Sequence, residues 1–141
     1  MQAERKITAI FLLDEDPFCL AIYEQRLHNA GYRQVKAFKE EHSLLAALEN
    51  QPDIVFIVSG WHAAEANCLK LIKKIKSSNP DIYVVLLLGS DSLYLAEVYR
   101  EAGAFTCLQK STRQEAAQII SVIRQIEHTT RLLEKRYFSN Q

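Results

Sequence analysis

The chain has 141 residues, of which 48% are hydrophobic, with 4 glycines and 3 prolines, a composition typical of one globular domain. Lysine plus arginine and aspartate plus glutamate number 17 each, so no overall positive charge favours nucleic acid or an anionic membrane surface as a partner. Cys19, Cys68 and Cys107 fit neither a disulfide framework nor a zinc pattern, and the charged N-terminal segment lacks a secretory layout. No apolar run is long enough to span a membrane, and together these features predict a cytoplasmic protein.

The first expected elements are a strand over residues 7–13 and a helix over residues 17–30. The strand is nearly all apolar rather than alternating, which is typical of a strand covered by helices on both faces. In the helix, apolar residues from Leu20 to Ala30 recur at steps of three and four and so share one face. Asp16 suits the N-cap of this helix, and Gly31 suits its end.

The middle of the chain continues the alternation of strand and helix. In the second helix of this part, apolar residues such as Ile72 are expected inward and lysines such as Lys76 largely outward. A weak strand, a short helix, a strongly apolar strand and a longer helix are expected at 34–38, 43–48, 54–58 and 64–77.

The last third of the chain repeats the pattern twice more. A strand, a helix, a weaker strand and a long helix are expected at 82–88, 92–102, 105–109 and 112–137. Five strand–helix units in succession predict a parallel sheet with right-handed crossovers and helices on both faces. For the strand order 2-1-3-4-5, the ligand crevice of such a sheet lies at the carboxyl ends of strands 1 and 3. Residues 13–16 and 58–60 are expected to line it.

The first loop of this crevice is acidic and contains no glycine. Asp14, Glu15 and Asp16 would repel the phosphates of a nucleotide, so a flavodoxin-like binder of a small cofactor is the least favoured function. Carboxylate oxygens suit Mg²⁺, and Asp14 with Glu15 are the candidate ligands for that ion. The alternative is that Asp16 is only a helix cap and that the other two residues belong to a solvated loop.

Three short segments together resemble the receiver domain of two-component response regulators over about residues 6–128. The segments are LLDEDP at 12–17, PDIVFIV at 52–58 and AGAFTCLQKS at 102–111. The resemblance implies the flavodoxin-like (βα)5 receiver fold, with 1–128 as the receiver-like domain and 129–141 as an extension of its last helix.

The resemblance also assigns roles to individual positions. It implies that Asp14 and Glu15 are the acidic pair that holds Mg²⁺, and that Lys110 is the lysine of the site. The phosphorylated aspartate of the family falls on Val58, and the hydroxyl residue that ends strand 4 falls on Leu88. Two further positions depart from the pattern, because the aromatic residue of strand 5 is Cys107 and the proline after the lysine is Ser111.

These departures predict a degenerate phosphorylation site. Acyl-phosphate formation needs a carboxylate nucleophile, and Val58 has no oxygen. Leu88 cannot hydrogen-bond a phosphoryl oxygen, and Lys110 is then expected to form only a structural ion pair with Asp14 or Glu15. We therefore expect a pseudo-receiver, not an enzyme, that engages a protein partner of a signalling pathway without phosphorylation. The alternative is a phosphorelay receiver with a displaced phosphoacceptor and Mg²⁺ at the acidic pair.

The last helix and one loop supply the expected contact residues. Six residues from Ile119 to Tyr137 alternate by four and three, which is a heptad pattern. Leu132, Leu133 and Tyr137 are expected beyond the body of the domain, where they would contact a second copy or a partner. Trp61, in the loop beside the crevice, is a further candidate anchor. The resemblance adds the face formed by helix 4, strand 5 and helix 5 as the expected partner surface.

Overall fold

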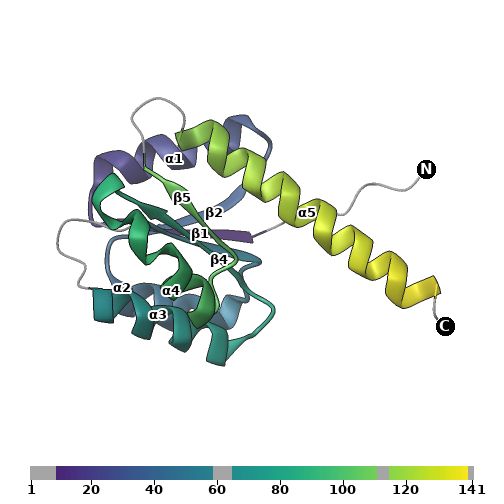
Figure 1. Ribbon diagram of the computed structural model, residues 1–141. Coiled ribbons are helices and arrows are strands. Elements are labelled where there is room, and N and C mark those ends of the chain that lie inside the picture. The colour runs from purple at the N-terminus through teal and green to yellow at the C-terminus, as the bar shows by residue number, and fades with distance from the viewer. Residues whose placement is uncertain (1–8, 59–64, 111–114, 140–141) are drawn as a thin grey trace.

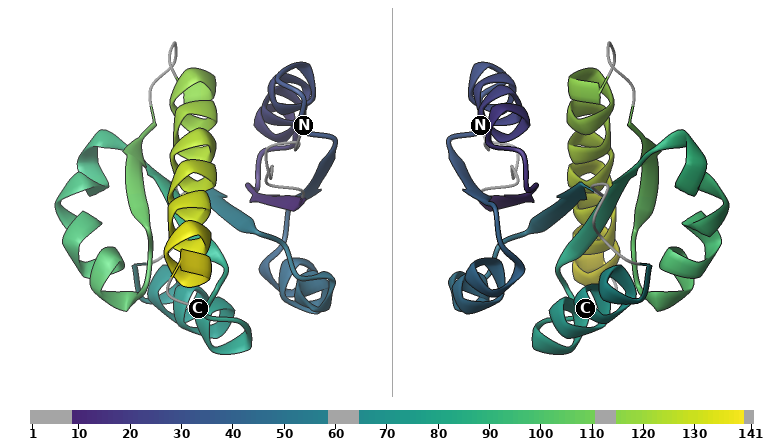
Figure 2. Two further views of the ribbon diagram at one scale, coloured as in Figure 1. Left: turned by 90° about the vertical axis from the view of Figure 1, so that its right-hand side faces the viewer. Right: turned by 90° about the vertical axis from the view of Figure 1, so that its left-hand side faces the viewer.

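The computed structural model of the chain describes residues 9–58, 65–110 and 115–139. Five parallel strands form one sheet in the order β2-β1-β3-β4-β5, with helices on both of its faces (Figures 1 and 2). This confirms the predicted fold class and strand order. The strands are β1 (Ala9–Leu13), β2 (Gln34–Phe38), β3 (Ile54–Val58), β4 (Tyr83–Leu88) and β5 (Thr106–Gln109).

The helices follow the predicted order with shifted ends. Those of α type are α1 (Pro17–Asn29), α2 (Glu41–Ala46), α3 (Glu65–Ser78), α4 (Ala96–Ala102) and α5 (Glu115–Ser139). Two short 3₁₀ helices, η1 (Ala47–Asn50) and η2 (Ser90–Leu95), lie beside α2 and α4. The predicted single helix over 92–102 was therefore wrong in its first part. There the Ser92 N–H donates to the Gly89 carbonyl at 3.0 Å, a bond of the tighter i→i+3 type.

The first helix begins and ends where the sequence predicts. The Asp16 carboxylate accepts a hydrogen bond from the Phe18 N–H at 2.9 Å, which satisfies one of the free donors of the first turn. Beyond the last turn, Gly31 adopts φ = 102°, a left-handed conformation that favours glycine. The helix thus leaves the carboxyl end of β1 directly at the crevice.

Alternating residues of the buried strands belong to two separate hydrophobic cores, one on each face of the sheet. Ile10, Leu12 and Val58 pack with α1 and α5 on one face of the sheet. Phe11 and Leu88 pack with α2, α3 and α4 on the other face. Since successive side chains of a strand point to opposite faces, this division follows from the apolar runs themselves.

The last helix is longer than the sheet that it covers. Ile119, Ile123 and Ile126 are buried against the sheet, whereas Leu132 and Leu133 are 50% and 56% exposed. Figure 1 shows the C-terminal half of α5 projecting beyond the sheet. Within the described residues, no helix combines the length and apolarity required to cross a membrane.

Candidate functional site

The predicted crevice is present at the carboxyl ends of β1 and β3. Leu13 and Ile57 lie side by side in the register of these two strands, so the next residues, Asp14 and Val58, reach the same edge of the sheet. A pocket of about 130 Å³ opens there. Its lining consists of Leu13, Asp14, Glu15, Lys39, Glu41, Ile57, Val58, Asn67, Cys68 and Leu71.

Asp14 is the buried acid of this pocket, only 3% exposed. Its Oδ1 accepts a hydrogen bond from the Asp16 N–H at 3.0 Å, while its Oδ2 is buried without a hydrogen-bond partner. Burial raises the pKa of the Asp14 carboxyl, although the bond from Asp16 and the charge of Lys110 act in the opposite direction. The carboxylate is therefore only half satisfied, and the structure excludes a solvated-loop role for this residue.

The two following acids differ from Asp14 in their surroundings. Glu15 is exposed at the rim of the pocket. Asp16 is the cap of α1, and its Oδ2 also accepts a bond from the Cys19 thiol at 3.3 Å. The backbone hydrogen bond from Phe18 is the main reason why the pKa of Asp16 lies below its ordinary value. Asp16 thus serves local structure, as the capping alternative proposed.

Val58 occupies the end of β3 as an ordinary core residue, only 6% exposed. It belongs to the core on the α1 and α5 side and also borders the pocket. Its side chain offers no hydrogen-bonding atom to this space. The position that the resemblance assigns to the phosphoacceptor is therefore an apolar wall.

Leu88 and Lys110 lie at the ends of the next two strands. Leu88 is fully buried in the opposite core, and its carbonyl accepts a bond from the Lys110 N–H at 2.7 Å. Among the described ion pairs none joins Lys110 to Asp14 or Glu15, so the expected structural ion pair is not formed. The structure brings Asp14, Glu15 and Val58 together in one pocket and places the other two residues outside its lining.

The residues at the pocket fit Mg²⁺ poorly. This ion is usually held by one or two carboxylates together with phosphate oxygens, at near-octahedral geometry. Val58 adds no oxygen, and Asp14 already uses one oxygen locally. In the part of the chain that the structure describes, no three acidic, histidine or cysteine side chains gather as a metal centre would require. Magnesium at Asp14 and Glu15 stays a prediction.

Several pocket residues were missed by the sequence analysis. Lys39 and Glu41 come directly after β2, the strand beside β1, and Asn67 and Cys68 lie near the start of α3. Because the carboxyl ends of parallel strands share one edge of the sheet, the position of Lys39 after a predicted strand was an available signal. Nothing in the local pattern of α3 marked Asn67.

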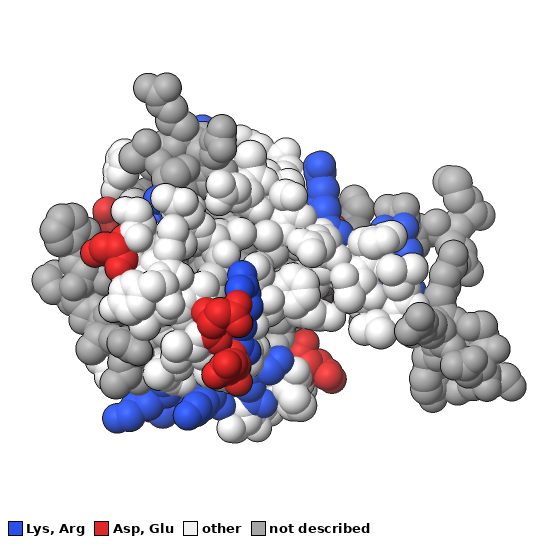
Figure 3. Space-filling view, viewed as in Figure 1, with Lys and Arg blue, Asp and Glu red and all other residues white. Residues whose placement is uncertain are grey.

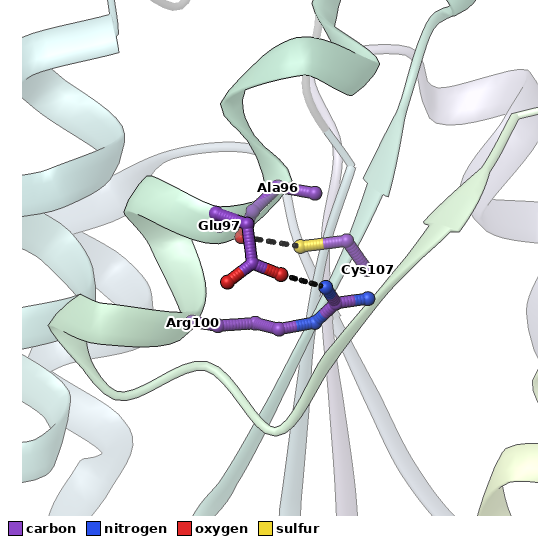
Figure 4. A network of polar contacts seen from close by, with 4 residues as sticks. All are labelled: Ala96, Glu97, Arg100 and Cys107. Carbon is purple, nitrogen blue, oxygen red and sulfur yellow. Dashed lines mark hydrogen bonds and ion pairs between the residues drawn. The ribbon is translucent and has the colours of Figure 1, made fainter.

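The face of α4 and β5 carries a small polar network in place of an aromatic side chain. The Cys107 thiol donates to the Ala96 carbonyl at 3.8 Å, and Arg100 pairs with Glu97 at 2.6 Å (Figure 4). Burial raises the pKa of the Cys107 thiol, so this group remains protonated and weakly nucleophilic. Most of the surface on the side viewed in Figure 3 is uncharged, and near its centre acidic and basic groups form one mixed cluster.

The candidate contact residues are described only in part. Trp61 lies outside the described residues, and so does the side chain of Tyr137. Leu132 and Leu133 are exposed on the projecting part of α5, as expected for residues that lie beyond the body of the domain.

Comparisons with known proteins agree with the fold. The family model described as the response regulator receiver domain matches residues 10–124. The two-component response regulator ARR2 of Arabidopsis thaliana is 27% identical over 111 residues, which are 79% of this chain and 17% of that protein. The chain therefore spans less than a fifth of the length of this curated relative.

Solved structures give the same picture at the level of fold. A crystal structure of NtrX from Brucella abortus in complex with ATP superimposes with a TM-score of 0.78 at 23% identity, over 94% of this chain and 29% of that one. A CheY-like receiver domain protein from Methanospirillum hungatei JF-1 gives a TM-score of 0.74 at 20% identity, over 88% of this chain and 96% of that one.

Proposed function

Because the chain belongs to the response regulator receiver domain family, we propose that it acts as a pseudo-receiver. In this role it binds a protein partner of a two-component pathway without being phosphorylated at the end of β3. Receiver domains are generally signalling modules rather than catalysts, and the proposed function requires no turnover.

The single observation that carries this proposal is the apolar end of β3. Val58 lies beside Asp14 at the edge of the pocket, where an acyl phosphate would need an attacking carboxylate oxygen. Leu88, at the end of the neighbouring strand, is fully buried and has no hydroxyl for a phosphoryl group. The chain keeps the fold of the family. At the positions where the resemblance places the phosphorylated aspartate and the hydroxyl residue, Val58 and Leu88 have hydrocarbon side chains.

Phosphorylation by a small donor tests the proposal directly. The chain is incubated with acetyl phosphate and Mg²⁺, and the mass of the intact protein is measured. We expect no phosphate adduct on the unmodified chain. The variant Val58→Asp restores a carboxylate nucleophile at the end of β3, so we expect it to gain an adduct and it serves as the matched control. A stoichiometric adduct on the unmodified chain would contradict the pseudo-receiver function.

That contradicting result would support the rival function, a phosphorelay receiver with a displaced acceptor. Its support is that Asp14 and Glu15 are retained at the pocket, and that the charge of Lys110 opposes part of the rise in the pKa of Asp14 that burial causes. Proteolysis and mass mapping of the adduct would then locate the acceptor residue.

We further propose that residues 129–141 form a contact segment distinct from the receiver-like body over 1–128. The exposed Leu132 and Leu133 on the projecting helix support contact with a second copy or with a partner helix. The adjacent face of α4, β5 and α5 is the second partner surface that we propose, in line with the largely uncharged surface of that side. Pull-down with and without the segment after His128 separates these two surfaces.

A further inference from the structure

The pocket beside Val58 carries more negative than positive charge. Asp14, Glu15 and Glu41 contribute three carboxylates to its lining, against one ammonium group from Lys39. From outside the lining, Lys74 lies 3.8 Å from Glu41 and offsets that carboxylate in part, and the charge of Lys110 acts on Asp14. Among the lining residues themselves, two of the three carboxylates come from the consecutive acids at the end of β1.

One of these acids has an unused hydrogen-bonding atom. The Oδ2 atom of Asp14 is buried without a partner, and the residue itself is 97% buried, since only 3% of it is exposed. A buried carboxylate oxygen without a donor is costly, because it has lost its water and gained nothing in exchange. A donor that entered the pocket beside Asp14 would recover part of this cost, so this atom is independent support for a ligand.

The size and the walls of the pocket restrict what can enter. Its volume of about 130 Å³ is well below the roughly 300–1,000 Å³ of sites for drug-sized molecules. Leu13, Ile57, Val58 and Leu71 supply apolar walls, and Asp14, Glu15 and Glu41 add carboxylates to the same lining. A short aliphatic stem that ends in a cation matches both properties, because such a stem packs on apolar surface while its charged head meets polar groups.

We infer that this pocket receives the ammonium or guanidinium side chain of a lysine or arginine residue from the protein partner. The inference rests on the proposed function and names the partner chemistry at the same site. Mg²⁺ is less suited to the pocket, because this ion requires a nearly complete set of oxygen ligands and gains nothing from aliphatic walls. In this proposal Val58 contributes to binding. It provides an apolar surface for the stem of the incoming side chain, at the position where the resemblance places a carboxylate.

Nuclear magnetic resonance titration with n-butylguanidinium chloride tests the inference. We expect saturable shifts of the amide signals of pocket residues such as Asp14, Glu15 and Cys68. Butan-1-ol has the same stem without the charge, and at constant ionic strength MgCl₂ supplies a cation without a stem. Equal shifts with butan-1-ol would show that the pocket binds apolar groups without regard to charge. Saturation by MgCl₂ alone would identify a metal site. Either result overturns the inference.

Variants test which acid is responsible. We expect Asp14→Asn to weaken binding by about tenfold, the effect of losing one charge-assisted hydrogen bond. Glu15→Gln alters an exposed side chain of the same pocket, and we expect it to weaken binding as well. Glu101→Gln, an exposed acid of α4 outside the pocket, is the matched control and should bind as the unmodified chain does. Unchanged binding in both pocket variants would overturn the inference.

A peptide distinguishes a partner side chain from a small free cation. The probe acetyl-Gly-Gly-Arg-Gly-Gly-amide presents the same group on a polypeptide backbone, and we expect it to shift the same signals. Binding of butylguanidinium without binding of the peptide would exclude a protein side chain as the occupant. None of these readouts depends on phosphorylation, so a phosphate adduct with acetyl phosphate would overturn the proposed function separately from the pocket chemistry.

Discussion

Asp14 and Val58 border the same pocket, yet burial has opposite consequences for them. Removing a valine side chain from water stabilises the fold, whereas removing a carboxylate from water opposes its ionised form. The raised pKa of Asp14 records this cost, and the nearby Lys110 charge reduces it. A carboxylate at position 58 would add electrostatic repulsion with Asp14 and Glu15. A valine at this position avoids that repulsion.

The substitution Val58→Asp should therefore lower the free energy of unfolding at neutral pH in the absence of divalent metal. The loss of valine burial costs about 1.5–3 kcal/mol, and charge repulsion from Asp14 and Glu15 adds to it. Urea unfolding in the presence of a chelator measures the change.

The variant Val58→Asn separates burial from charge, because asparagine has nearly the same shape as aspartate without the ionisation. We expect the aspartate variant to be the less stable of the two at pH 7. Like-charge neighbours and burial raise the folded-state pKa of an introduced carboxyl, so the difference should shrink as the pH falls and this group is protonated. Equal stabilities at pH 7 would mean that the carboxylates do not repel one another.

At the scale of elements, a side-chain hydrogen bond joins the segment after α1 to α5, between residues that are 95 positions apart in the sequence. The Tyr32 hydroxyl, just after α1, donates to the Glu127 carboxylate on α5 at 2.9 Å. Burial, and then this hydrogen bond, raise the pKa of Tyr32 to about 12. The bond joins the segment after α1 to α5 close to the point at which α5 leaves the body.

Replacing Tyr32 by phenylalanine removes this tie. We expect Tyr32→Phe to lower the free energy of unfolding by about 1 kcal/mol near pH 8, the usual contribution of one hydrogen bond. The exposed Tyr94 on η2 supplies a matched control, because Tyr94→Phe removes a hydroxyl from the surface and should change stability little.

The same pair of variants gives a pH dependence with a defined sign. The pKa of Tyr32 is higher in the folded state, about 12, than its ordinary value of 10.0. The folded state therefore holds this proton more tightly, and the stabilisation is present below pH 10 and is lost as the pH rises through the folded-state pKa. The stability advantage over Tyr32→Phe should decrease between about pH 10 and pH 12. An advantage that stays constant over this range would contradict the hydrogen bond.

At the scale of the whole molecule, the sequence predicted the sheet and its crevice because they depend on long apolar runs and on chain order. The uniform hydrophobicity of Ile54–Val58 was sufficient to predict that this strand lies at the centre of the sheet. The strand order 2-1-3-4-5 was taken from the doubly wound parallel sheets. With that order, residues 14 and 58 were expected to lie close together, because parallel strands have their carboxyl ends at one edge of the sheet.

Features that depend on tertiary contacts were not predictable in this way. Lys76 was expected largely outward with the other lysines of α3, yet its ammonium donates to the Pro80 and Ile82 carbonyls at 2.6 and 2.9 Å. The missing partner of Asp14 Oδ2 and the distance of Lys110 from both acids likewise depend on side-chain conformations that no periodicity encodes. Such details decide the chemistry of the pocket, whereas the apolar pattern decides only where the pocket lies.

The projecting half of α5 leads to a prediction about the molecule as an assembly. Leu132 and Leu133 are adjacent and half exposed on a helix that has already passed the sheet, and the heptad spacing that buries Ile119, Ile123 and Ile126 reaches Leu133. We expect weak, reversible self-association, with the mass from light scattering rising above 16.2 kDa as the concentration increases. Leu132→Glu combined with Leu133→Glu should keep the chain monomeric, because a charge at each position opposes burial between helices. Phe18→Glu, which changes an exposed apolar residue on α1, is the control and should still associate. A strict monomer at every concentration, unaffected by removal of the residues after His128, would leave the exposed leucines to a different protein partner.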